Sequence, residues 1–157
     1  MPHAPDSSDH LGFLVADVGR LLRRAFQARL DGTADTVTYA QARVLVWLAR
    51  AEGLRQVDLA ERLEIQPITL ARLVDQLAAA GLVERRADPG DRRAYRLHLT
   101  PAAAPRLAEI RAIGDAVRAE ALAGLDARQA AATVDGLRRI RASLATPRRV
   151  RAVRRAA

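Results

Sequence analysis

Hydrophobic residues recur mainly at helical spacing along this chain. Between residues 9 and 30 they return every three or four positions, which predicts one long amphipathic helix behind the capping residues Ser7, Ser8 and Asp9. A second helix is expected to begin at Thr38, where Gln41 completes a capping box, and to end near residue 53. Further helices are predicted over residues 56–63, 66–80, 101–122 and 126–145.

Particular residues mark the ends of these later helices. In the helix over residues 56–63, Val57, Ala60 and Leu63 form the expected apolar stripe. Gly81 follows the next helix, at a position where a left-handed residue is favoured. Pro105 is expected to kink the helix after residue 101 or to delay its regular start.

The period becomes shorter between Leu82 and Thr100. Residues 94–100 alternate apolar and polar side chains, as a half-buried strand does, and residues 82–86 read as an earlier strand. A polar turn around Pro89 and Gly90 lies between the two. A hairpin directly after two short helices outlines a winged helix-turn-helix, so we expect a mainly helical fold with a small β-wing.

The net charge is concentrated at the C-terminus. The 157 residues carry a formal charge of +8, and all 26 basic side chains are arginine. Residues 136–157 contain eight of these arginines and no acidic residue, so the rest of the chain is balanced. A high net charge often marks a nucleic-acid-binding protein, but here it describes a tail that is expected to be disordered.

Other counts exclude whole classes of protein. The chain has no cysteine, and His3, His10 and His98 are too scattered for a metal site. No glycine-rich phosphate loop, catalytic pair or paired carboxylates support an enzyme, and no cofactor or metal is expected. No apolar run reaches the length of a membrane span, and the first ten residues lack a hydrophobic signal region. We expect a soluble cytoplasmic protein.

The helix over residues 66–80 takes the position of a recognition helix, whose N-terminal residues face base edges in the major groove. Its inward face is predicted to consist of Leu70, Leu73, Val74 and Leu77. The residues left toward solvent or DNA are Gln66, Pro67, Ile68, Thr69 and Arg72. Glutamine can read adenine, and arginine can read guanine. Alternatively, Arg72 is an exposed arginine on an ordinary helix.

The predicted wing adds further arginines. Arg92 and Arg93 follow its turn, and one guanidinium there could enter the narrow minor groove of DNA. Arg85, Arg86 and Arg96 would extend the positive edge. The alternative is a solvated turn in which Asp88 and Asp91 neutralise two of these five arginines.

These segments resemble the MarR family of bacterial transcription regulators, and specifically its SlyA-like branch. The resemblance rests on the helix text IQPITLARLVDQL, the following strand GLVERR and the wing DPGDRRAYRLHLT with the proline after it. It covers about residues 9–145. It implies that Arg72 enters the major groove and Arg92 the minor groove, whereas Arg93 pairs with Asp75 and braces the wing against the recognition helix.

The resemblance also implies a domain organisation and partners. Helices of residues 9–37 and 101–145 would form a dimerisation region beside a winged helix-turn-helix domain of residues 38–100, with disordered ends at 1–8 and 146–157. The homodimer would bind a pseudo-palindromic double-stranded DNA operator. A small aromatic or anionic effector would release the DNA. Candidate effector-binding residues are Arg20, Arg23, Phe26, Tyr39 and Trp47, although a core or solvated surface role explains each of them more readily.

Two functions are therefore consistent with the sequence. The preferred one is a dimeric sequence-specific DNA-binding repressor or activator, because the helix pair, the wing and the flanking helices agree with one another. The alternative is a winged-helix module for protein contacts without specific DNA binding, since the fold alone does not imply DNA binding. The apolar Pro67 and Ile68 favour this alternative.

Overall fold

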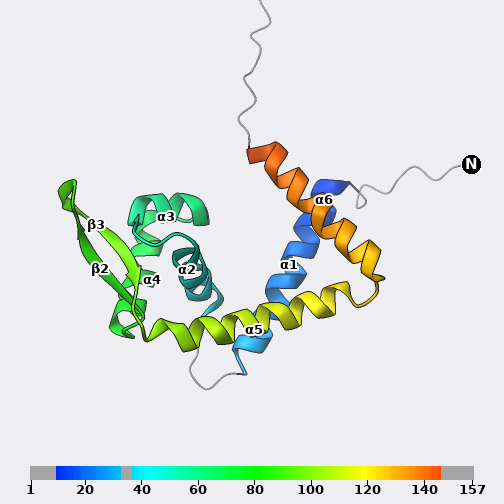
Figure 1. Ribbon diagram of the computed structural model, residues 1–157, viewed down its shortest axis with the longest axis horizontal. Coiled ribbons are helices and arrows are strands. Elements are labelled where there is room, and N and C mark those ends of the chain that lie inside the picture. The colour runs from blue at the N-terminus through cyan, green and yellow to red at the C-terminus, as the bar shows by residue number, and fades with distance from the viewer. Residues whose placement is uncertain (1–9, 33–36, 146–157) are drawn as a thin grey trace, which may run out of the picture. The chain divides into compact units, whose positions relative to one another are not determined.

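A computed structural model of the protein describes residues 10–32 and 37–145, which form helices and one small sheet (Figure 1). In chain order the elements are α1 (Leu11–Leu30), α2 (Tyr39–Arg50), β1 (Leu54–Arg55), α3 (Gln56–Leu63), α4 (Pro67–Ala79), β2 (Val83–Asp88), β3 (Asp91–Leu99), α5 (Ala103–Leu122) and α6 (Ala127–Ala145). The predicted mainly helical fold with a β-wing is confirmed. The predicted disordered ends and the caps at residues 7–9 lie outside the described residues.

Local capping chemistry sets several helix ends where the sequence predicts them. At the start of α2 the Thr38 side chain accepts from the Gln41 amide, and the Gln41 side chain accepts from the Thr38 amide. Asp126 and Gln129 form the same reciprocal pair at the start of α6. Gly81, at φ 71°, follows α4 in the left-handed conformation that the sequence predicts.

Proline positions agree with helix geometry. Pro67 is the first residue of α4, where the amide would have no helical partner. α5 begins at Ala103, so Pro105 falls in its first turn, where a missing amide again costs no helical bond. The delayed start predicted for this helix is therefore observed.

The turn between α3 and α4 depends on a left-handed residue. Glu64 has φ 54° and is the one non-glycine residue with positive φ in the described part of the chain. The Ile65 amide donates to the Ala60 carbonyl and closes the end of α3. The prediction that Val57 faces inward is wrong, because its side chain is 63% exposed. Leu59 shares the inward face with Ala60 and Leu63, which places Val57 roughly 110° from its centre.

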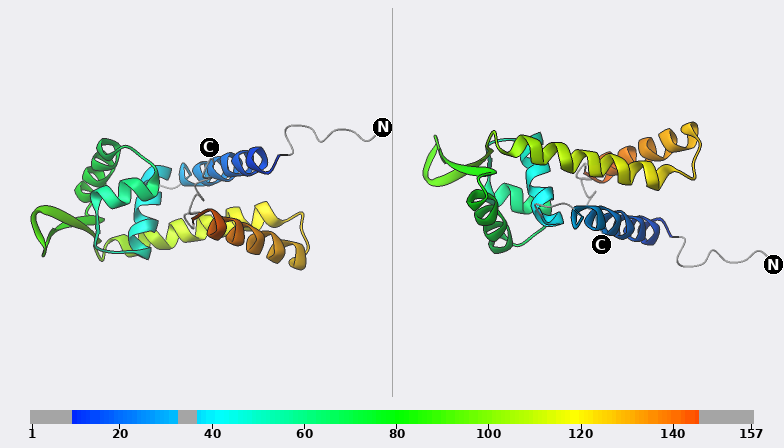
Figure 2. Two further views of the ribbon diagram at one scale, coloured as in Figure 1. Left: turned by 90° about the horizontal axis from the view of Figure 1, so that it is seen from above. Right: turned by 90° about the horizontal axis from the view of Figure 1, so that it is seen from below.

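The sheet has the strand order β1-β3-β2, and both pairings are antiparallel. The predicted hairpin of β2 and β3 is confirmed, with Arg85 opposite Leu97, but both strands run further toward the turn than predicted. β1 was not predicted, because a two-residue strand has no readable period. The hairpin lies beside α3 and α4, with its turn at the free end (Figure 2).

Apolar side chains from helices and sheet form one core. Its fully buried members include Leu45, Leu59, Leu70, Val74 and Leu97. Leu30 at the end of α1 and Leu107 on α5 join the same core, so it fixes the inner face of α4 against its neighbours. The predicted inward face of α4 is confirmed, with Leu73 only partly buried.

The chain divides into two compact units, residues 1–118 and 119–157, and the boundary falls within α5. α1 therefore groups with the winged segment, although the sequence assigns it to a dimerisation region with the last two helices. That assignment concerns a second copy of the chain and stays a prediction. No helix in the described ranges is both long and apolar enough to cross a membrane.

Candidate nucleic-acid interface

The first turns of α4 present a mixed polar and apolar surface. Gln66, Pro67, Ile68, Thr69 and Arg72 are all exposed, as the sequence predicts. The Gln66 carbonyl accepts from the amides of Thr69 and Leu70, which fixes the start of the helix while the Gln66 side chain stays free to contact another molecule. Amide, hydroxyl and guanidinium groups side by side are suited to reading base edges.

Arg72 has no hydrogen-bonding or ion-pair partner among the residues that the structure describes. It lies two residues after the buried Leu70 and two before the buried Val74, so it stands on the outer face of a helix with a fixed inner face. Its guanidinium is therefore available to an external partner.

The ion pair predicted between Asp75 and Arg93 is not formed in this structure. Asp75 Oδ1 instead accepts from Arg85 Nη2 at 2.6 Å. β2 follows α4 directly and contacts it, whereas β3 lies between β1 and β2 in the sheet. Arg93 is four residues nearer the turn than Leu97, the partner of Arg85, which is about 13 Å along the strand.

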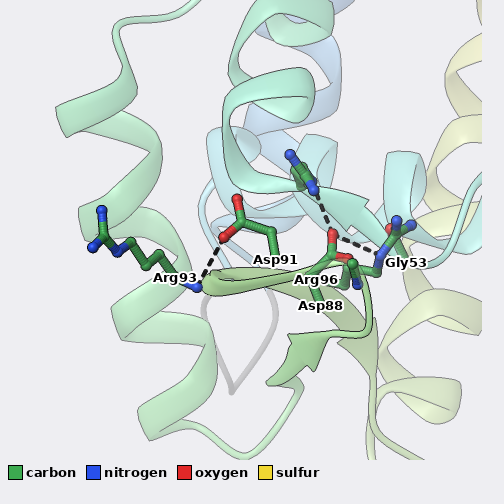
Figure 3. A network of polar contacts seen from close by, with 7 residues as sticks. Gly53, Asp88, Asp91, Arg93 and Arg96 are labelled. Atoms are coloured by element: carbon green, nitrogen blue, oxygen red, sulfur yellow. Dashed lines mark hydrogen bonds and ion pairs between the residues drawn. The ribbon is translucent and has the colours of Figure 1, made fainter.

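The other arginines of the hairpin differ in how far they are engaged. Arg86 forms an exposed ion pair with Glu84 at 2.5 Å. The Arg93 side chain is exposed and has no polar partner within the described ranges, although its amide donates to Asp91 Oδ1. Figure 3 shows this side chain extending away from Asp88. Arg92 belongs to β3, but its side chain lies outside the described part of the structure.

Asp88, at the end of β2, is the buried charged residue of the described chain, with its side chain 1% exposed. Its Oδ2 accepts from Arg55 Nε at 2.8 Å and lies 3.1 Å from Arg96 Nε, while its Oδ1 accepts from the Gly90 amide at 2.8 Å (Figure 3). The contact with Arg96 Nε is an ion pair without hydrogen-bond alignment. Arg96 Nη1 donates to the Gly53 carbonyl.

These contacts change the acidity of the groups. The hydrogen bond from the Gly90 amide, followed by that from Arg55, lowers the pKa of Asp88 below its ordinary value. The same contact with Asp88 raises the pKa of Arg55. The sequence indicates Asp88 as a partner for wing arginines but gives no sign of Arg55, because Arg55 reaches the wing only through the unpredicted β1.

The candidate effector residues line two neighbouring hollows at α1 and α2. Arg20, Arg23 and Tyr39 line a hollow of about 440 Å³. Phe26, Tyr39 and Trp47 line a smaller one of about 120 Å³. Tyr39 thus belongs to both, and both hollows lie within the first compact unit.

Contacts within this group orient its aromatic rings. The Arg23 guanidinium lies 5.9 Å from the centre of the Tyr39 ring, and Phe26 meets the same ring edge to face at 5.6 Å. Arg62 lies over the Trp47 ring at 5.7 Å. Arg20 is held by an exposed ion pair with Asp17. A hollow with cationic and aromatic walls suits an aromatic or anionic molecule.

The helix pair, the hairpin packed beside it and the exposed start of α4 together define a winged helix-turn-helix protein. Residues 35–94 match the MarR family. Among solved structures, apo wild-type MarR from E. coli is 26% identical, with a TM-score of 0.77, over 86% of this chain and 98% of that one. The chain thus resembles MarR-family proteins over residues 35–94 and shares the overall fold of solved MarR structures, and these matches support a winged-helix transcriptional regulator.

Two further structures extend the likeness. A MarR-family transcriptional regulator from Rhodococcus sp. RHA1 is 28% identical, with a TM-score of 0.77, over 92% of this chain and 98% of that one. The PcaV transcriptional regulator from Streptomyces coelicolor, solved in complex with its natural ligand, is 26% identical, with a TM-score of 0.69. That likeness covers 90% of this chain and 98% of PcaV.

Proposed function

We propose that the protein binds double-stranded DNA sequence-specifically, as a homodimer, and represses transcription. The observation that carries this proposal is the selective engagement of arginines at the candidate interface. Arg85, Arg86 and Arg96 are paired with acidic side chains of the chain itself, whereas Arg72 and Arg93 have no such partner in the described residues. Unpaired guanidinium groups on a rigid helix and strand suit an anionic partner with defined geometry.

The chemistry of α4 suggests how bases are read. Arg72 would contact guanine and Gln66 adenine, each through two hydrogen bonds in the major groove. Ile68 and Thr69 would contact thymine methyl groups or phosphate, and Pro67 would pack beside them. Arg86 and Arg93 would add phosphate contacts. By the family resemblance, Arg92 would enter the minor groove, whose narrow regions attract arginine.

Selection of bound sequences from random DNA tests this function. The wild-type protein should select a two-fold symmetric motif, and Arg72→Ala should lose preference at the positions that α4 reads. Arg92→Ala should instead lose preference in the flanking minor groove. Arg50→Ala is a matched control, because Arg50 is exposed at the end of α2, outside the candidate interface.

Failure of the wild-type protein to select any motif would contradict the proposal. The exposed apolar side chains of Val57 and Ile68 would then favour the second candidate function, a winged-helix module that binds another protein. Capture of a partner that Ile68→Ser abolishes would support that alternative.

The exposed apolar surface of α1 supports the homodimer. Its large exposed side chains are Leu11, Phe13, Leu14, Val15, Val18, Leu21 and Leu22. Contiguous apolar surface of this kind on one helix is typical of a protein interface. On α6, Leu137, Ile140 and Leu144 are exposed as well. Size-exclusion chromatography with light scattering should give the mass of a dimer, and a monomer at micromolar concentration would contradict the proposal.

The hollows beside Tyr39 support a small aromatic or anionic effector, and the PcaV structure contains a ligand. A phenolic carboxylate would place its ring against Tyr39 and Phe26 and its charge beside Arg20 or Arg23. Titration with phenolic acids should release bound DNA, and Arg23→Ala should raise the concentration required. An unchanged DNA affinity across the series would indicate a regulator that does not respond to this class of ligand.

The proposal also includes the branch of the MarR family and the cellular location of the protein. We assign the chain to the SlyA-like branch on the text of α4 and the wing, and to the cytoplasm on its proposed role at DNA. Grouping of its selected operator and effector response with regulators of that branch would test the assignment.

A further inference from the structure

We propose that Asp88 is a positioning residue for the wing: it ties the turn and β3 to the start of α3, so that the wing and α4 meet DNA at a fixed spacing. This inference rests on the proposed DNA-binding function. Asp88 itself is buried and would not touch DNA.

One carboxylate connects segments that are distant in sequence. Oδ1 holds the Gly90 amide in the turn of the hairpin, and Oδ2 faces the Nε atoms of Arg55 and Arg96. Arg55 directly precedes α3, and Arg96 lies opposite it in the β1–β3 register. Arg96 also donates to the Gly53 carbonyl, so side-chain bonds of both Asp88 and Arg96 join the wing to the segment that leads into α3.

Burial distinguishes Asp88 from the other carboxylates of this region. The side chains of Glu84 and Asp75 are 45% and 66% exposed, and such surface pairs contribute little to stability. A buried carboxylate, in contrast, depends on its partners, because removing one leaves an uncompensated charge.

Apolar packing does not extend to the outer hairpin. Val83 and Leu97 anchor its base in the core. From residue 84 to residue 96, Asp88 is the one buried residue among those whose side chains are described. The orientation of the outer hairpin therefore depends on the Asp88 contacts rather than on hydrophobic packing.

The direction of the change in DNA affinity distinguishes an effect of wing position from an effect of net charge. Asp88→Asn removes one negative charge, and a more positive protein should bind DNA more tightly if charge alone matters. Loss of the wing position should instead weaken binding to the operator. Glu84→Gln is the matched control, because it removes the same charge from the same strand but from an exposed pair.

The experiment measures the Kd for the selected operator and for random DNA, with the melting temperature of each variant as a folding check. Asp88→Asn should weaken operator binding about tenfold, which corresponds to about 1.4 kcal/mol. Glu84→Gln should leave operator binding unchanged or tighter. Arg55→Gln should reproduce the loss without altering Asp88 itself, and its control, Arg50→Gln, loses the same positive charge elsewhere. If Asp88→Asn does not fold, Arg55→Gln carries the test.

A double-mutant cycle with Arg92→Ala provides a readout that a general loss of stability would not give. If Asp88 acts by positioning the wing, adding Asp88→Asn to Arg92→Ala should cost little further affinity. Additive losses would overturn the inference, as would unchanged operator affinity in both Asp88→Asn and Arg55→Gln. If the wild-type protein binds no operator, the proposed function itself fails, which is a different outcome.

Discussion

Replacing Arg72 with alanine should weaken operator binding far more than replacing Arg86, although both changes remove one positive charge from the same proposed surface. Arg72 has no acidic partner in the described part of the chain, whereas Arg86 is held by Glu84 at 2.5 Å. If only the number of charges mattered, the two variants would lose equal affinity for the operator. Because Arg86 is already paired and Arg72 is not, we expect the larger loss of affinity for Arg72→Ala.

The expected magnitudes follow from the two environments. A two-bond contact between arginine and guanine contributes ~1–3 kcal/mol, so Arg72→Ala should weaken operator binding from about 5-fold to about 150-fold. To contact phosphate, Arg86 must exchange an exposed ion pair that is itself worth ~0–1 kcal/mol. We therefore expect a loss below about fivefold for Arg86→Ala.

Fluorescence anisotropy with labelled operator and random duplexes, over a series of salt concentrations, measures both effects. Arg72→Ala should reduce operator affinity and leave random-sequence affinity nearly unchanged, because base contacts carry the specificity. Arg86→Ala should reduce both slightly and make the salt dependence a little shallower. Equal losses for the two variants on both duplexes would refute the reasoning from ion-pair partners.

Three other changes test separate parts of the structure. Leu97→Ala at the fully buried centre of β3 should lower the free energy of unfolding by ~2–5 kcal/mol in urea titrations, and Leu99→Ala at a half-buried site by less. Because folding lowers the pKa of Asp88 below 3.8, this residue stabilises the fold above that pH, and its contribution is lost as pH falls through the lower folded value. The stability difference between wild type and Asp88→Asn should therefore shrink in urea titrations below about pH 4, and a constant difference would contradict the assignment. Asp75→Ala should not weaken operator binding, because it releases Arg85 rather than Arg93; a clear loss in the anisotropy assay would restore the bracing role predicted from the resemblance.

Helix ends and strand alternation were predictable because their determinants are local. The capping pair of Thr38 and Gln41, the left-handed Gly81 and the alternation over residues 94–100 each involve residues only a few positions apart. Such patterns indicate the type of an element before its neighbours are known. The inward face of α3 was misjudged at Val57, because a helix of eight residues offers too few apolar positions to locate its centre.

Ion-pair partners were not predictable, because they depend on the register of the sheet and on its neighbours. Arg85 and Arg93 are both close to Asp75 in sequence, and the choice between them follows from β2 lying next to α4. Arg55 is 33 residues from Asp88, and the two meet only because β1 pairs with β3. A strand of two residues leaves no pattern from which that pairing could be inferred.

Asp75 pairs with Arg85 and not with the predicted Arg93, and this difference determines which wing arginine is available to DNA. Had Asp75 held Arg93, the hairpin would present Arg85 as its uncommitted guanidinium, close to the end of α4. Because Arg85 is paired with Asp75 instead, the unpaired guanidinium among the described hairpin residues is that of Arg93, which lies nearer the turn. That position is farther from the base of the hairpin, so the reach of the wing depends more strongly on its orientation. The buried contacts of Asp88, at the same end of the hairpin, are therefore the feature on which its contact with DNA should depend.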